Sequence, residues 1–407
     1  YTEENTLSLH DALPISRDVF VVGAARTAIG TFGGSLKDVP LADLATLAVK
    51  TALERSGAQA AGVGHLAMGT VIPTEPRDAY LSRVAAMNAG LPKETPAFNV
   101  NRLCGSGLQA IVSAAQAITL GDCEVAIGAG AESMSRGAYL LPQARWGARM
   151  GDSPMLDYVV GALHDPFHKI HMGMTAENVA EQYGISRTMM DELSVESHRR
   201  AAAAIAAGRF KEQIVPVVIA SKKGDISFDT DEHVKASTTM ETLAKMRAAF
   251  KKDGSVTAGN ASGINDGAGA VVLASADAVK AQNLKPIARL VAYAHAGVEP
   301  TIMGIGPVPA TKLALARAGL KVSDLDVIES NEAFAAQACA VVKELALDPA
   351  KVNPNGSGIS LGHPIGATGA IITTKALYEL QRIGGRYALV TMCIGGGQGI
   401  AAIFERA

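Results

Sequence analysis

The sequence predicts an α/β protein built from two similar halves. Helical and strand patterns alternate along its 407 residues, as in the helical stretch 41–56 and the short apolar run 65–68 that follows it. Residues 51–57 resemble residues 313–319, and each segment precedes a short apolar strand at similar spacing. Later in each half come a Gly-Ser-Gly segment, an Ala-rich helix and a strand that runs into a Gly-rich turn. Two copies of one α/β unit would explain this repetition.

A region of different composition separates the two halves. It is richer in Met, His and charged residues, and a long irregular insertion of this kind is often a lid over a site. One amphipathic helix is expected inside it, over residues 186–207, with Ser186 as its N-cap and Gly208 as its stop. The predicted organisation is a first half (17–132), an inserted loop domain (133–250), the end of the first half (251–284) and a second half (285–407).

The first sixteen residues differ from the rest of the chain. They lack the charged start, apolar middle and small-residue cleavage site of a signal peptide. The globular pattern begins at about Arg17, with an apolar run of the β type over residues 19–22. We therefore interpret residues 1–16 as a leader that is a tag or an artefact, and we exclude it from the fold prediction.

Composition argues against several classes of partner. The formal net charge is −2 and no run of Lys and Arg stands out, so no nucleic acid is expected to bind. No apolar stretch of about twenty residues is apparent, so no membrane span is expected. Four cysteines in so long a chain, without a CxxC pair, indicate a reducing compartment, the cytoplasm, rather than a disulfide scaffold. They are Cys104, Cys123, Cys339 and Cys393.

Cys104 is expected at a turn between a strand over residues 98–100 and a helix over residues 105–120. Free amide groups and the dipole at a helix N-terminus stabilise a thiolate and lower the pKa of a thiol. The flanking glycines would let a substrate approach the backbone. Cys104 is thus a candidate nucleophile, and the alternative is a buried structural cysteine beside a tight turn.

His363 and Cys393 also lie in glycine-rich turns. His363 precedes Pro364 and an expected helix over residues 367–380, which favours an extended backbone at the histidine. Its imidazole could accept a thiol proton near neutral pH, or it could be a satisfied turn residue. Cys393 follows a buried strand over residues 387–392 and precedes three glycines, whose amides could bind an oxyanion. Its alternative is an apolar cysteine at a strand end.

Asn331 follows a predicted strand over residues 327–328 and precedes an expected helix over residues 332–345. Its amide could hold a water or a carbonyl group, or it could simply cap the helix.

Four segments in order resemble the signature blocks of the thiolase family: 101–107, 331–334, 362–369 and 393–399. The similarity runs from about Arg17 to the end and is greatest to bacterial β-ketothiolases, the acetyl-CoA C-acetyltransferases of polyhydroxyalkanoate synthesis. It implies two halves packed face to face in a five-layer α-β-α-β-α core with an inserted loop domain. It also implies a homotetramer, a dimer of dimers.

The resemblance implies reversible Claisen condensation of acyl-CoA with acetyl-CoA, giving 3-ketoacyl-CoA and CoA by ping-pong kinetics. Cys104 would carry the acyl group, and His363 would deprotonate it and help to bind the thioester oxygen. Asn331 would position a water that completes this first oxyanion site. Cys393 would remove a proton from acetyl-CoA, and the amides of Cys104 and Gly395 would form a second oxyanion site.

The resemblance further assigns contacts with coenzyme A and the acyl chain. Neither a metal nor a permanently bound cofactor is expected, since CoA and acyl-CoA are substrates. Three histidines in 164–171 have a spacing that could suggest a metal, but Pro166 interrupts any helix and no Cys or Glu completes a ligand set. The residues expected to bind substrate are Leu163, His171, Met172, Phe250, Ala258, Ser262 and Phe334.

Two other functions compete with this prediction. A ketoacyl synthase would share the fold and the nucleophile, but it would have a histidine where this chain has Cys393. A non-catalytic acyl-CoA carrier derived from the fold would have lost a reactive residue. This sequence keeps all four reactive residues, Cys104, Asn331, His363 and Cys393.

Overall fold

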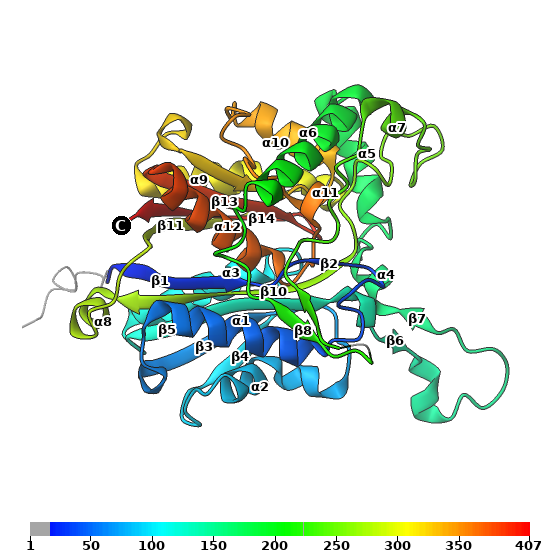
Figure 1. Cartoon of the computed structure of the whole chain (residues 1–407). Helices are drawn as coiled ribbons and strands as arrows, with labels where there is room; N and C mark the ends of the chain where they lie inside the picture. Colours follow the sequence, from blue (N-terminus) through cyan, green and yellow to red (C-terminus); the bar gives the residue numbers. More distant parts are fainter. Residues whose placement is uncertain (1–16, 223) are drawn as a thin grey trace, which may run out of the picture.

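The computed structural model describes residues 17–222 and 224–407, so the expected leader, 1–16, lies outside the described residues. Figure 1 shows two α/β halves stacked one above the other. The strands of the first half are β1 (Val19–Arg26), β2 (Gly30–Thr31), β3 (Val63–Gly69), β4 (Ala97–Val100), β5 (Val125–Ser133) and β10 (Asn265–Ser275). Those of the second half are β11 (Ala288–Gly297), β12 (Val327–Ser330), β13 (Tyr387–Ile394) and β14 (Gln398–Arg406).

The two halves have the same strand order, which confirms the predicted duplication. The first sheet runs β1-β10-β5-β3-β4 and the second runs β11-β14-β13-β12. In each half the last strand in the sequence, β10 or β14, is antiparallel to both of its main neighbours. The pair β3 with β5, like the pair β12 with β13, is parallel. A single parallel bridge from Ile328 to Val352 lies where β4 lies in the first half.

Helices complete the five expected layers (Figure 1). The buried side chains of α3 and α12 pack with strands of both sheets in one apolar cluster, so these two helices form the central layer. One outer layer covers the first sheet and the other covers the second. The helices of these layers are α1 (Leu41–Ser56), α2 (Leu81–Asn88), α3 (Ser106–Leu120), α8 (Ala276–Ala281), α9 (Pro307–Ala318), α10 (Ala335–Glu344), α11 (Gly358–Leu361) and α12 (Thr368–Ile383).

Hydrogen bonds also join the two sheets directly at one edge. β1 pairs with β11 through Phe20 with Arg289 and Val21 with Ala288, so the bonding path crosses from one half to the other. This junction brings corresponding strand ends of both halves to the same face of the molecule.

The segment Leu103–Leu120 corrects the expectation that no apolar stretch is long enough to cross a membrane. It is long and apolar enough to cross a membrane by length and composition alone, but 67% of it is buried inside the protein. Because α3 lies between two sheets, protein covers most of its apolar surface, as expected of a core helix, and the exposed Leu120 lies at its end.

The chain between β5 and β10 forms the inserted region. Its helix α6 begins after Ser186, whose hydroxyl accepts a hydrogen bond from the Met189 amide, and ends before Gly208, as predicted. A thin arm that carries β6 and β7 projects from the body in Figure 1. The elements of this region are β6 (Tyr139–Leu140), β7 (Leu156–Asp157), α4 (Tyr158–Ala162), α5 (Met172–Tyr183), α6 (Arg187–Ala206), β8 (Val217–Ile219), β9 (Ile226–Phe228) and α7 (Met240–Ala244).

The helix expected over residues 332–345 begins later than predicted, since α10 starts at Ala335. The preceding residues are held in an extended path instead. The backbone amide of Asn331 donates to the Thr391 carbonyl, and Phe334 forms a β-bridge with Ala261. Asn331 is therefore no helix cap, which leaves its side chain available for other contacts.

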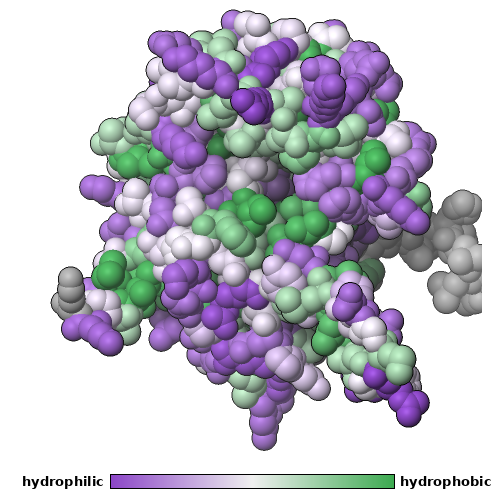
Figure 2. All heavy atoms as spheres, turned by 90° about the vertical axis from the view of Figure 1, so that its right-hand side faces the viewer, coloured by the Kyte–Doolittle hydropathy of each residue, from purple (hydrophilic) through white to green (hydrophobic). Residues whose placement is uncertain are grey.

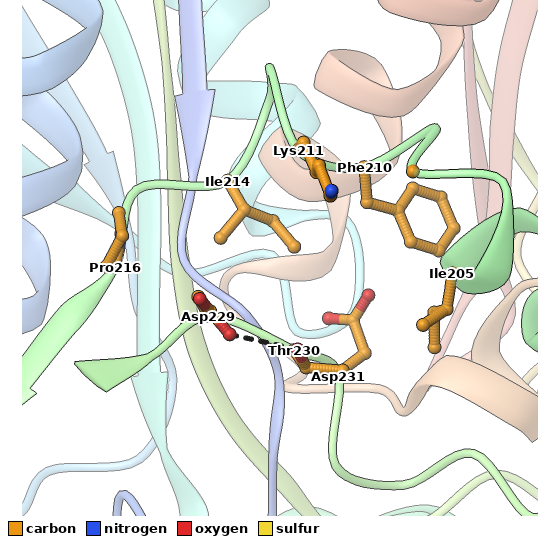
Figure 3. A pocket seen from close by; sticks show the side chains of 9 residues that line it. Ile205, Phe210, Lys211, Ile214, Pro216, Asp229, Thr230 and Asp231 are labelled. Atoms are coloured by element: carbon orange, nitrogen blue, oxygen red, sulfur yellow. Dashed lines mark hydrogen bonds between the residues drawn. The ribbon is translucent and has the colours of Figure 1, made fainter. Parts of the chain in front are cut away.

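A buried ion pair fastens the inserted region to β1. The Arg26 guanidinium lies 2.8 and 2.9 Å from the two carboxylate oxygens of Asp231, and both side chains are fully buried. The guanidinium also lies 5.0 Å from the centre of the Phe210 ring. Asp231 and Phe210 line a cavity of about 300 Å³, which Figure 3 shows from close by.

We expect Asp231→Asn to lower the free energy of unfolding by about 3–5 kcal/mol, because it leaves a buried guanidinium without its counter-charge. Urea denaturation of both proteins measures the difference. Asp38→Asn is the matched control: Asp38 pairs with Lys37 at the surface, where such a pair contributes less than about 1 kcal/mol. Equal effects of the two substitutions would contradict the prediction.

Candidate active site

The four predicted reactive residues lie at the same end of the two halves. Cys104 follows β4, Asn331 follows β12, Cys393 lies near the end of β13, and His363 lies in the turn before α12. β14 ends at the C-terminus on the left of Figure 1, and β13 is antiparallel to it, so these strand ends point to the right. Figure 2 shows that face, on which apolar side chains gather near the centre among hydrophilic ones.

Cys104 sits beside an unusual backbone conformation. The preceding residue, Leu103, has φ 46°, in the left-handed region that non-glycine residues rarely adopt. Two short-range bonds hold it there: the Leu103 amide donates to Asn101 Oδ1 at 3.0 Å, and Ser106 Oγ donates to the Leu103 carbonyl at 2.6 Å. Strain of this kind persists only where the surroundings fix it, and it concentrates at functional sites.

The Cys104 thiol is more basic than the sequence suggested. Burial raises its pKa to about 11, although the Gly395 amide and the Cys104 amide oppose the shift by hydrogen bonding to the sulfur. The expected lowering at a helix N-terminus is therefore wrong, because loss of solvent outweighs the helix amides. The resting thiol keeps its proton, so a nucleophilic role requires a base.

His363 is buried, and burial lowers its pKa to about 4, so the ring is neutral. Its Nδ1 lies 2.7 Å from Thr368 Oγ1, and that hydroxyl donates its one hydrogen to the Pro364 carbonyl at 2.9 Å. Thr368 must therefore accept from Nδ1–H, which leaves the lone pair on Nε2. The backbone amide of His363 donates to Asn265 Oδ1 at 2.9 Å and fixes the turn. His363 is thus set up to accept a proton at Nε2.

Asn331 lies directly against this ring. Its Nδ2 is 3.4 Å from each ring nitrogen of His363, and its side chain is fully buried. Within the described chain, Asn331 Oδ1 is buried and has no hydrogen-bond partner. A buried amide oxygen without a donor is costly, so a water or a substrate group is expected to occupy this position.

Cys393 is the second thiol of the site and, unlike Cys104, it is fully buried. Burial raises the pKa of Cys393 well above the usual range, and the proximity of the Cys104 sulfur adds to the shift. The glycines after it shape the backbone that faces Cys104. Gly396 and Gly397 have φ 81° and 84°, and a Cβ on Gly397 would lie 2.2 Å from the Val298 carbonyl oxygen. Only glycine fits there, so this turn keeps the Gly395 amide close to the Cys104 sulfur.

Several residues predicted to bind substrate line the approach to these thiols. Met172 Sδ lies 3.5 Å from the position that a Cβ of Gly395 would take. The Met172 amide donates to the Leu163 carbonyl at 2.8 Å, and Leu163 packs in the same apolar cluster as Cys104. These two residues therefore form one wall of the site.

Aromatic rings form a second wall. The His171 ring stacks on Phe250 at 4.7 Å, and Phe250 meets Phe334 edge to face at 6.2 Å. The Ser262 amide donates to the Ala333 carbonyl at 3.0 Å, and Ala258 lies exposed at the other end of the same segment. All the predicted substrate-binding residues thus lie on segments that the fold brings beside the reactive residues or beside one another. Across the described ranges, no group of three or more His, Cys, Asp and Glu side chains is arranged to hold a metal ion.

Sequence reasoning missed the residues that orient His363. Thr368 lies inside the block that carries His363, but its role depends on a tautomer that only the hydrogen bonds reveal. Asn265 lies 98 positions away in the chain, and no local pattern connects it with the histidine. Glu132 was not predicted either, although a carboxylate near the end of a largely apolar, buried strand indicates a specific role.

Comparisons with known proteins match this geometry to one family. The family model described as "Thiolase, N-terminal domain" matches residues 19–277, and "Thiolase, C-terminal domain" matches residues 284–406. The chain is 68% identical to "Beta-ketothiolase BktB" of Cupriavidus necator over 393 residues, covering 96% of this chain and 100% of the relative. It is 48% identical to an "Acetyl-CoA acetyltransferase" of Syntrophomonas wolfei, with the same two coverages.

Solved structures agree with these sequence matches. A human mitochondrial 3-ketoacyl-CoA thiolase superposes with a TM-score of 0.94 at 46% identity, covering 97% of this chain and 100% of that one. The Bacillus anthracis acetyl-CoA acetyltransferase superposes with a TM-score of 0.95 at 46% identity and the same coverages. The human enzyme in complex with CoA gives a TM-score of 0.93 over 96% of this chain and 98% of that chain.

Proposed function

The chain belongs to the thiolase family, and from that premise we propose how its residues carry out the reaction. The enzyme is an acyltransferase that condenses an acyl-CoA with acetyl-CoA, reversibly, to give 3-ketoacyl-CoA and CoA. The observation that carries the residue assignment is the placement of a half-buried Cys104 beside the buried Cys393 and the Gly395 amide, with a neutral His363 at the same end of the two halves.

In the first half-reaction, His363 Nε2 takes the proton of Cys104 as the sulfur attacks the thioester carbonyl. The amides of Cys104 and Gly395 stabilise the oxyanion, which is supported by the bond from the Gly395 amide to the sulfur. The C–S bond to coenzyme A then breaks, and the leaving sulfur takes a proton from Cys393. Acyl-Cys104, a Cys393 thiolate and protonated His363 remain, so atoms and charge balance.

In the second half-reaction, the Cys393 thiolate removes a proton from the methyl group of acetyl-CoA. The enolate oxygen is stabilised by protonated His363 and by a water held at the unpaired Oδ1 of Asn331. The carbon then attacks acyl-Cys104, and the Cys104 sulfur leaves and recovers its proton from His363. The products are 3-ketoacyl-CoA and the starting form of the enzyme.

Asn331→Ala is expected to lower kcat/KM for condensation by about 10²–10³, the usual loss for one oxyanion-stabilising group. The water would lose its anchor while the thiols stay in place. Steady-state condensation assays measure the loss. Asn178→Ala is the control, since Asn178 lies outside the proposed machinery and its side-chain amide donates to the Thr301 carbonyl at 2.9 Å. A condensation rate for Asn331→Ala equal to that of the control would contradict the role.

The quaternary state and the setting of the enzyme are also proposals. We propose a homotetramer, which is supported by large apolar side chains exposed on the β6–β7 arm. A cytoplasmic location is supported by four free cysteines in the described chain, and a role in polyhydroxyalkanoate synthesis by the likeness to the Cupriavidus protein. No permanently bound cofactor takes part in the proposed steps. The arm residues are Tyr139, Leu140, Leu141, Trp146, Met150 and Met155.

The purified full chain tests the proposed function. We expect it to cleave acetoacetyl-CoA with CoA, and to condense acetyl-CoA with itself and with propionyl-CoA, with parallel double-reciprocal plots. Absence of CoA-dependent cleavage would reject the enzyme in favour of a carrier. Failure of propionyl-CoA alone would reject only the acceptance of longer acyl chains, since one methylene changes discrimination by about 1–3 kcal/mol.

A further inference from the structure

One buried carboxylate ties together the segments that surround the two reactive turns. Glu132, in the last residues of β5, is fully buried. Its Oε2 accepts from the Gly366 amide at 2.7 Å, and its Oε1 accepts from the Ile72 amide at 2.9 Å. The Val71 amide donates to both oxygens, at 3.3 and 3.1 Å. Three backbone donors from two distant segments therefore converge on one side chain.

These contacts are those of a carboxylate rather than a carboxylic acid. Burial, with a smaller contribution from the charge of Asp266, raises the pKa of Glu132 to about 8 and favours the protonated form at neutral pH, whereas the three amides favour the charged form. The hydrogen-bond geometry decides for the charged form. Both oxygens of Glu132 face N–H donors, so a proton on either one would displace a hydrogen bond. No cation pairs with Glu132 among the described side chains, and the backbone amides supply the compensation.

The backbone of Gly366 is fixed at its carbonyl group as well as at its amide. Three glycines pack closely on its carbonyl oxygen. A Cβ added to Gly69, Gly107 or Gly130 would lie 2.8, 3.1 or 2.6 Å from this oxygen, respectively. A Cβ on Gly366 itself would lie 2.5 Å from Glu132 Oε2. Close packing around the carbonyl oxygen and the carboxylate at the amide therefore hold the backbone of this residue in place.

The fixed backbone of Gly366 links His363 to Cys104. It lies three residues after His363, whose own amide is held by Asn265, so the turn is fastened at both ends. Gly107, which packs on the Gly366 carbonyl, belongs to the first turn of the helix that follows Cys104. A shift of Gly366 would therefore change the placement of the base relative to the nucleophile.

Resting on the proposed function, we propose that Glu132 is a positioning residue that holds the His363 turn in register with Cys104. It does so by clamping the amides of Gly366, Val71 and Ile72. Val71 and Ile72 pack in the same apolar cluster as Cys104, so the clamp also places one wall of the site.

Glu132→Gln tests the clamp, since it keeps the shape but turns an N–H₂ group toward an amide that donates. We expect kcat for acetoacetyl-CoA cleavage to fall about 30–100-fold with KM for CoA within twofold, because a misplacement of about 1 Å costs on the order of 10²-fold. A merely structural role would lower the melting temperature and the active fraction without changing kcat per active site, which is counted by titration of Cys104 acylation.

Asp326→Asn is the matched control. Asp326 also accepts from two backbone amides, those of Arg386 and Tyr387, but it precedes β12, at the end of the sheet opposite to the site. We expect its kcat to stay within twofold of wild type. Gly366→Ala gives a second test, because it displaces the same carboxylate without removing its charge.

The outcomes separate this inference from the proposed function. An inactive wild-type enzyme rejects the function itself. An active wild type with an unchanged kcat in either Glu132→Gln or Gly366→Ala overturns only the positioning role. If neither variant folds, the carboxylate serves the fold and the positioning role is likewise overturned.

Discussion

Replacing Cys104 with alanine is expected to lower the rate of acetoacetyl-CoA cleavage by at least about 10⁴-fold, the scale seen when a covalent nucleophile is removed. The acyl group would have no carrier. If CoA attacked the substrate directly, His363 would have no thiol to deprotonate. Initial rates with saturating CoA measure the loss. Intact mass of the wild type after incubation with acetyl-CoA should show one added acetyl group, which the variant should lack.

Two other thiols provide controls for this experiment. Cys123 lies beyond the end of α3, and Cys339 lies in α10, where burial raises its pKa to about 12. Cys123→Ala and Cys339→Ala are expected to keep wild-type turnover and to gain the acetyl group. Turnover above about one percent in Cys104→Ala, or acetylation at another cysteine, would reject Cys104 as the carrier.

Local signals predicted much of the fold because the residues that make them act on their own backbone. The helix 41–56 was bounded in the sequence by Gly57, which has φ 68° at the C-cap of α1. Ser186 capped α6 as expected, since its hydroxyl needs only the amide three residues later. The repeat predicted two copies of one unit, and the two halves do show the same strand order, because similar patterns of helices and strands pack in similar ways.

Features that depend on distant partners escaped the sequence. The late start of α10 reflects the bond from the Asn331 amide to Thr391, sixty residues away. The raised pKa of Cys104 depends on how completely the folded chain encloses the thiol, and the helix that follows it gave the opposite expectation. Glu132 and Asn265 likewise act through contacts that exist only after β5, β10 and the His363 turn have assembled.

The two thiols are expected to have different tasks: Cys104 carries the acyl group, and Cys393 removes the proton from acetyl-CoA. Cys393→Ala is expected to lower condensation of acetyl-CoA by about 10²–10⁴-fold, the usual contribution of a general base. Acetylation of Cys104 by acetyl-CoA should persist, because His363 still takes the thiol proton and the Gly395 amide still faces the sulfur. Without Cys393 to protonate the leaving sulfur, this acylation should be slower than in the wild type but still complete.

Two assays on the same variant divide these steps. Rapid-quench mass spectrometry follows the acetyl group on Cys104, and product analysis follows acetoacetyl-CoA. We expect the acetylated enzyme to accumulate in Cys393→Ala and to be released when CoA is added in excess, since reversal of acylation needs no carbon base. Loss of acetylation and condensation to the same extent would mean that acylation of Cys104 itself requires Cys393. The division of labour would then fail, because the base proposed for the carbon acid would be required for the nucleophile instead.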